Sequence, residues 1–176
     1  MSPIRTLAAL TAAAALAFAP STAAAGGAKG NIVAAAMSST DHQTLVAAVK
    51  AAGLVDTLAS KGPFTVFAPT DAAFAKLPAG TVNTLLEPAN RDQLRAVLTY
   101  HVVPGKVRAA DLIGQIQANG GQTVLKTVQG GTLTARLVDG KVALSDAKGG
   151  TAFVTTADLV QANGIIHVTD AVSLPL

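Results

Sequence analysis

The 176-residue sequence contains no cysteine and no tryptophan. Without cysteine it can form no disulfide, thiol nucleophile, zinc–thiolate site or iron–sulfur cluster, and it offers no thiol for lipid attachment. Aromatic residues are only 3% of the chain. With no tryptophan, an aromatic stacking surface for nucleic acid is not expected. We therefore expect neither a cofactor nor a nucleic-acid partner.

Charged side chains are also few, at 13% of the residues. Thirteen Lys and Arg against ten Asp and Glu give a formal net charge of +3, and no three like charges are adjacent. Such scattered charges do not form a stripe that binds polyanions. Half of the residues are hydrophobic, which excludes a disordered chain, and the length is that of one folded domain.

No apolar run is long enough to cross a membrane. Arg5 precedes Leu7–Ala19, an uncharged run of 13 residues, and Ala23–Ala25 supplies small residues after it. A membrane span needs about 20 residues, whereas this pattern is typical of a secretory signal peptide. The mature protein is therefore expected to be secreted or periplasmic, with no membrane span. The predicted division is a signal peptide over 1–25, a flexible lead-in over 26–30 and a single domain over 31–176.

The first half of the mature chain has mainly helical spacing. Asn31 is a candidate cap for a short helix, and Thr40 with Gln43 forms a capping-box pattern for the next one. Phe64–Ala68 is rich in strand formers, and Thr70 or Asp71 is expected to cap the helix that follows it. Later helical spacing runs over Thr81–Leu86 and Asn90–Thr99.

The second half changes to a period of two. Asp139 and Gly140 form a strong hairpin signal, which places Leu137 opposite Val142. Further strands are expected at Val124–Val128, Phe153–Val160 and Ile165–Val168. Helices followed by strands predict an α+β fold.

The three histidines are candidate catalytic or metal-binding side chains. The sequence has no G-x-S-x-G motif and no pair of histidines at metal-ligand spacing. His42 lies in a polar first helical turn and is expected to be solvated. His101 and His167 lie in apolar runs, where a hydrogen-bonded structural histidine is the usual case. Asp71 and Asp170 each follow a strand and are expected to cap turns or helices.

Three segments together resemble the fasciclin domain family. They read TVFAPTDAAF at Thr65–Phe74, LTYHVVPG at Leu98–Gly105 and NGIIHVTDAVSLP at Asn163–Pro175, and the resemblance covers about residues 31–176. It implies a wedge of several β-strands with a cluster of helices packed beside it. It also implies extracellular adhesion or protein binding, without enzymatic activity.

The resemblance also suggests site residues. In animal members a Tyr-His pair flanked by branched aliphatic residues is implicated in integrin binding, and the matching pair here is Tyr100 and His101. Their flanking residues are Leu98, Val102 and Val103. A core position for the same five side chains is the alternative, since their apolar character suits a buried strand or helix end. The residues assigned to the structural motif are Thr70, Asp71, Phe74, His167 and Asp170.

These observations favour a secreted, monomeric adhesion module that binds a cell-surface, matrix or envelope macromolecule. Some fasciclin-like proteins are similar to carotenoid-binding ones, so the resemblance, together with the apolar composition, also implies an alternative. This is an extracytoplasmic carrier of a lipophilic small molecule, carotenoid- or lipid-like, in a groove of the same fold. A third alternative is a hydrolase that uses His101 or His167 with an acid, although no nucleophile motif supports it.

Overall fold

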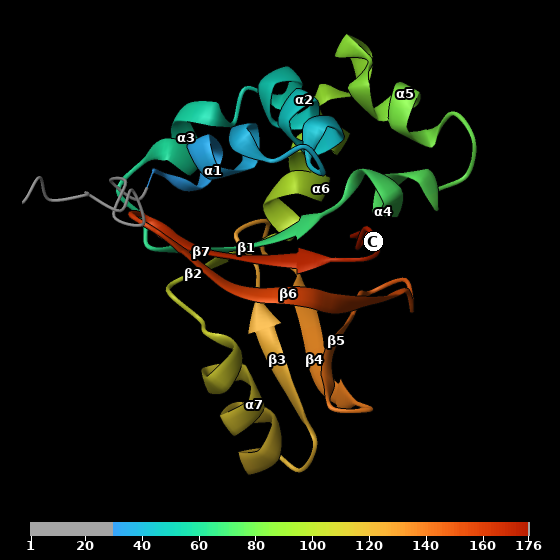
Figure 1. The fold of residues 1–176 in the computed structure, drawn as a ribbon. Helices are drawn as coiled ribbons and strands as arrows, with labels where there is room; N and C mark the ends of the chain where they lie inside the picture. The colour runs from blue at the N-terminus through green and yellow to red at the C-terminus, as the bar shows by residue number, and fades with distance from the viewer. Residues whose placement is uncertain (1–29, 176) are drawn as a thin grey trace, which may run out of the picture.

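The helices of the first half lie together on one side of a β-sheet. The computed structural model describes residues 30–175, and Figure 1 shows α1 to α6 gathered above the sheet with α7 apart from them. Within residues 30–175 no helix is both long enough and apolar enough to cross a membrane. The α-helices are α1 (Ile32–Ser38), α2 (Gln43–Ala52), α3 (Val55–Ala59), α4 (Asp71–Ala75), α5 (Thr81–Leu86), α6 (Arg91–Tyr100) and α7 (Ala109–Ala118), and a 3-10 turn, η2 (Pro88–Asn90), precedes α6.

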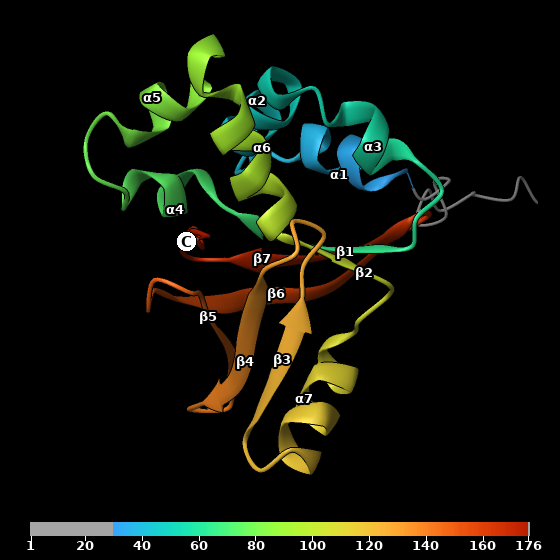
Figure 2. The same ribbon diagram turned by 180° about the vertical axis from the view of Figure 1, so that it is seen from behind.

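The strands form a sheet of seven in the order β2-β1-β7-β6-β5-β4-β3. Strands β1 and β7, second and third in this order, are parallel and in register from Phe64 opposite Gly164, and every other neighbouring pair is antiparallel. Figure 2 shows β3, β4 and β5 extending away from the layer of α1 to α6, on the side where α7 lies. The strands are β1 (Phe64–Pro69), β2 (Val102–Pro104), β3 (Gln122–Lys126), β4 (Thr132–Val138), β5 (Lys141–Ser145), β6 (Thr151–Gln161) and β7 (Gly164–Thr169).

Strand β1 separates two hydrophobic cores. Val66 and Ala68 pack with the helices α1, α2, α3 and α6, while Phe67 between them packs with α7 and the strands β3 to β5. Successive side chains of a strand point to opposite faces, so one short strand serves both cores. This double burial explains why β1 is an almost uninterrupted apolar run in the sequence.

Most of the predicted elements are confirmed. Asn31 caps α1 through a 2.8 Å bond from the Ala34 N–H, and Leu137 pairs with Val142 across the predicted hairpin. The α+β class is confirmed as well. The strand expected at Val124–Val128 lies two residues earlier, and α7 was not predicted.

The capping box predicted for α2 is wrong. The helix begins at Gln43, and neither Thr40 nor the N-cap residue His42 gives it a side-chain bond. The carboxylate of Asp71 accepts hydrogen bonds from the backbone N–H of Thr44 (2.7 Å) and of Gln43 (3.3 Å) instead. A carboxylate is a stronger acceptor than a hydroxyl at the positive end of a helix, and tertiary folding brings it there.

Asn163 joins the helical layer to the turn between β6 and β7. Its Oδ1 accepts from the Ile32 N–H at 2.9 Å, and its Nδ2 donates to the carbonyls of Leu58 (2.7 Å) and Ser60 (2.8 Å). The side chain is buried, and both kinds of amide atom are bonded. Asn163 therefore fixes the start of α1 and the end of α3 to the sheet.

We expect Asn163→Asp to lower the free energy of unfolding by about 2–4 kcal/mol, because a buried carboxylate would face two carbonyls that have lost their donors. Urea unfolding followed by circular dichroism measures this loss. The matched control is Asn83→Asp on exposed α5, which should change stability by no more than about 0.5 kcal/mol. Equal effects of the two substitutions would contradict the role given to Asn163.

Candidate functional site

The Tyr100–His101 pair lies at the end of α6, between the two cores. Tyr100 is 1% exposed, and its hydroxyl donates to the Thr132 carbonyl at 2.6 Å. The same oxygen accepts from the Ala147 N–H at 3.2 Å. The phenol therefore connects α6 to β4 and to the loop after β5.

His101 is bonded to the backbone through both ring nitrogens. Its Nε2 accepts from the Ser173 N–H at 3.0 Å, so the ring proton is on Nδ1, which donates to the Val97 carbonyl at 2.7 Å. Burial lowers the pKa of His101, and this outweighs the Val97 carbonyl and Asp146, which favour the charged ring. The ring is therefore neutral near pH 7 and holds the end of the chain against α6.

His167, on β7, is likewise bonded to the backbone through both ring nitrogens. Its Nδ1 accepts from the Asp158 N–H at 3.3 Å, and its Nε2 donates to the Val107 carbonyl at 2.7 Å. The ring stacks on Phe67 with centroids 5.5 Å apart. Burial again lowers its pKa, against the opposing effects of the Val107 carbonyl and Asp158.

The five side chains suggested for partner binding are all buried. None of them is more than 5% exposed in the folded domain. They fill the cores from α6 and β2, and they offer no surface for direct contact. Their influence on partner binding stays a prediction, which a binding measurement can test. The five are Leu98, Tyr100, His101, Val102 and Val103.

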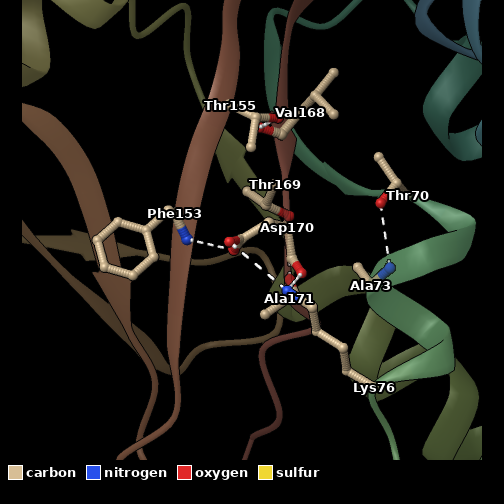
Figure 3. Close-up of polar contacts among 9 residues, drawn as sticks. All are labelled: Thr70, Ala73, Lys76, Phe153, Thr155, Val168, Thr169, Asp170 and Ala171. Atoms are coloured by element: carbon tan, nitrogen blue, oxygen red, sulfur yellow. Dashed lines mark hydrogen bonds and ion pairs between the residues drawn. The ribbon is translucent and has the colours of Figure 1, made fainter.

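Thr70 and Asp170 follow the ends of β1 and β7 (Figure 3). Thr70 caps α4 by accepting from the Ala73 N–H at 3.2 Å. Asp170 accepts from the Phe153 N–H at 2.8 Å and returns a backbone bond to the Phe153 carbonyl at 3.1 Å. The Lys76 ammonium donates to the Asp170 carbonyl at 2.7 Å and lies 3.8 Å from its carboxylate. These contacts hold the carboxyl ends of β1 and β7 against α4 and the residue after it.

His42 is not solvated, contrary to expectation. It is 7% exposed, and its Nδ1 lies 2.7 Å from the Ser39 hydroxyl. Its Nε2 has no hydrogen-bond partner among residues 30–175. The polar neighbours in the sequence suggested a surface turn, but packing of α1 and α2 over the sheet covers the ring. No pattern in the sequence predicts this burial, since it depends on contacts distant along the chain.

The His42 ring lines an apolar cavity of about 90 Å³. We call this the α1–α2 cavity. Its walls come from α1, α2, α3, α6, β1, β2, β7 and the last residues of β6, and most of its lining is aliphatic. Met37 and Leu159 border it although they are 47% and 39% exposed. Across residues 30–175 no three His, Asp or Glu side chains are grouped as metal ligands.

Comparison with known proteins gives the family. The family model of the fasciclin domain matches residues 40–175. The chain belongs to the fasciclin domain family. This confirms the resemblance carried by the three sequence segments.

Relatives of this fasciclin domain include bacterial proteins. It is 50% identical over 144 residues to Protein sll1483 of Synechocystis sp., covering 82% of this chain and 73% of that protein. It is 38% identical over 122 residues to cell surface glycolipoprotein MPB83 of Mycobacterium bovis, covering 69% of this chain and 48% of that one. The fasciclin domain is therefore similar to a protein named for its place at a cell surface.

A solved structure has the same fold. The FAS1 domain pair of the insect cell adhesion molecule fasciclin I aligns with a TM-score of 0.70 at 21% identity. The alignment covers 81% of this chain and 50% of that one. The expected arrangement of a strand wedge with helices beside it is confirmed.

The two neutral histidines predict a loss of stability in mild acid. The unfolded chain takes up protons on His101 and His167 near pH 6.5, whereas burial delays this uptake in the folded state. The free energy of unfolding should therefore be highest above pH 6.5 and should fall as the pH decreases below it. The slope has an upper limit of about 2.7 kcal/mol per pH unit for the two residues together.

Urea unfolding at pH 7.5, 6.5 and 5.5 measures this slope. His167→Gln removes one of the two titrating rings and should make the slope shallower. A wild-type stability that stays constant from pH 7.5 to 5.5 would contradict the prediction.

Proposed function

We propose that this fasciclin domain is an exported, non-enzymatic binding module that attaches to a macromolecule of a cell surface, matrix or envelope. The observation that carries the proposal is the family match, which covers residues 40–175. Two similar proteins support it, since one is a cell surface glycolipoprotein and the other a cell adhesion molecule. We propose that the domain acts as a monomer.

The chemistry of the described residues supports a non-enzymatic role. Both ring nitrogens of His101 and of His167 are engaged by the backbone. A general base needs a free nitrogen within reach of its substrate, so these rings are poorly placed for a hydrolase. Their hydrogen bonds and burial are instead those of groups that hold elements together.

Export is proposed from the sequence. The signal peptide predicted over residues 1–25 lies outside the described residues, as do residues 26–29 of the lead-in predicted over 26–30. The charged start, short apolar run and small terminal residues of the predicted signal peptide support cleavage after Ala25.

For Tyr100 and His101 we propose an indirect role in binding. Their hydrogen bonds join α6 to β4, to the loop after β5 and to the end of the chain. Removal of either side chain would lower the stability of the domain rather than remove a contact with the partner. The same reasoning applies to Leu98, Val102 and Val103, which pack beside them.

A binding measurement with Tyr100→Phe tests both proposals. Labelled wild-type protein should bind saturably to the surface or envelope fraction of its own cells, with a Kd in the micromolar range or tighter. Tyr100→Phe should lose about 1–3 kcal/mol of stability, since the Thr132 carbonyl and the Ala147 N–H lose their partner. At a temperature well below its unfolding transition, the variant should keep the wild-type Kd.

Two results would contradict these proposals. Absence of saturable binding up to high micromolar concentration would contradict the binding module. A tenfold weaker Kd for a fully folded Tyr100→Phe, with wild-type stability, would show that the hydroxyl itself touches the partner.

A second candidate function is an extracytoplasmic carrier of a lipophilic, carotenoid- or lipid-like molecule. The α1–α2 cavity is the specific observation that favours it, because binding sites for small molecules are concave and mainly apolar. Native mass spectrometry of the protein isolated from its own cells tests this. A stoichiometric small-molecule adduct would support the carrier, and a bare polypeptide mass would contradict it.

A further inference from the structure

The unpaired nitrogen of His42 distinguishes the α1–α2 cavity from an ordinary packing defect. His42 is more than nine-tenths buried and lines the cavity, and its Nε2 has no partner among residues 30–175. A buried polar atom without a partner costs free energy, so native proteins contain few of them. The other such side-chain atom in the described chain, Ser145 Oγ, belongs to a residue that does not line this cavity.

The neighbouring serine indicates which nitrogen of His42 carries the proton. The Ser39 oxygen accepts from the Asp41 N–H at 3.3 Å and lies 2.7 Å from His42 Nδ1. We assign the Ser39 hydroxyl proton to the bond with Nδ1, because no other acceptor for it is found among residues 30–175. With that assignment Nε2 carries a ring proton, and His42, a residue that lines the cavity, has a buried donor without an acceptor.

A water molecule alone is a poor hydrogen-bond acceptor for this donor, because the cavity offers it few other partners. A buried water molecule needs two to four polar partners, and apolar cavities usually stay dry. Apart from His42, the polar side chains in the lining are few: Ser39 and His101 are bonded elsewhere, and Lys50 and Gln161 belong to α2 and the end of β6. A ligand that brings both an acceptor and apolar surface would satisfy the donor and fill the space.

The charge of the lining favours the same kind of ligand. Lys50 is the one charged side chain among the described residues that line the cavity, and no Asp or Glu lines it. The aliphatic side chains around it, including Leu45, Val49 and Ile166, would contact hydrocarbon. An acceptor oxygen, neutral or anionic, therefore meets donors and no repelling carboxylate.

We propose that the α1–α2 cavity binds an apolar molecule through one terminal acceptor oxygen, a carboxylate or a carbonyl, which accepts a hydrogen bond from His42 Nε2. The proposal rests on the second candidate function and specifies the chemical class of its ligand. No covalent step is involved. The hydrogen bond orients the ligand, and the aliphatic lining supplies contact area.

The size of the cavity fits part of a ligand rather than a large one entirely enclosed. Its 90 Å³ corresponds to about three water molecules in the liquid. Met37 and Leu159 continue the apolar surface at its border, and both are more exposed than is usual for large hydrophobic side chains. A chain longer than the cavity would therefore remain in apolar contact where it leaves the protein.

Three ligands of equal chain length test the proposal with the purified protein. Octanoate carries a carboxylate, 2-octanone carries a carbonyl, and 1-octene has no acceptor oxygen. Binding is followed by two-dimensional NMR of labelled protein, including the imidazole nitrogens. We expect the oxygen-bearing ligands to shift the His42 Nε2 signal and to bind about fivefold to tenfold more tightly than 1-octene.

Variants of the cavity separate the hydrogen bond from hydrophobic contact. His42→Phe keeps an aromatic ring but removes the donor, so it should reduce the affinity for octanoate or 2-octanone to the level of 1-octene. His42→Gln keeps an N–H donor and should retain part of the preference. Val46→Phe fills the cavity from the middle of α2 and should abolish binding of all three ligands. Melting curves confirm that each variant is folded.

The outcomes separate the possible ligand sources. Binding of octanoate without 2-octanone would support the proposal and identify an anionic oxygen, which points to a fatty acid. Binding of both would support a neutral acceptor. Equal affinity for 1-octene, an unchanged affinity in folded His42→Phe, or no binding of any ligand would overturn it. Because attachment to cells is measured separately, these failures would leave the proposed binding module standing. An adduct found by native mass spectrometry despite them would place the carried molecule elsewhere.

Discussion

The parallel pairing of β1 with β7 is the constraint on which the rest of the structure depends. It joins strands separated by about a hundred residues, and β1 contributes side chains to both hydrophobic cores. The Thr-Asp pairs at the carboxyl ends of the two strands consequently meet, and the Thr70 N–H donates to the Thr169 carbonyl at 3.3 Å. From there one aspartate holds α2 and the other holds β6. The helical layer is thus attached to the sheet by polar contacts as well as by apolar packing.

The three histidines show how the same side chain takes different roles in a protein with few charges. His101 and His167 each use both nitrogens to connect distant backbone segments, and burial keeps them neutral. His42 uses one nitrogen locally, and its other nitrogen is buried without a partner among residues 30–175, in a side chain that lines an apolar cavity. The first two tie separate backbone segments together, which suits the proposed binding of a macromolecule by a surface of fixed shape. His42 is a buried polar side chain with an unpaired nitrogen in the mainly apolar lining of the α1–α2 cavity. Departures of this kind from the usual pairing of buried polar atoms are expected at sites of function.

Local signals in the sequence predicted much of this fold. The Asp139–Gly140 hairpin, the Asn31 cap and the apolar run of β1 each depend on residues close along the chain, and each lies where it was expected. The capping of α2 by Asp71 could not be predicted, because donor and acceptor are 27 residues apart. The burial of His42 was missed for the same reason. The candidate site is therefore less predictable than the fold, since long-range packing creates it.

The bonds of Asn163 have a consequence for the order in which the protein can fold as it is made. Its partners are Ile32, Leu58 and Ser60, from 131 to 103 positions earlier in the chain. During synthesis the first helices therefore cannot form these bonds until nearly the whole domain has emerged, and their apolar faces stay uncovered until then. Folds dominated by such distant contacts form slowly and expose surfaces that aggregate. For the export proposed above, a delay in folding would keep the chain in a form that can still be threaded through a membrane channel.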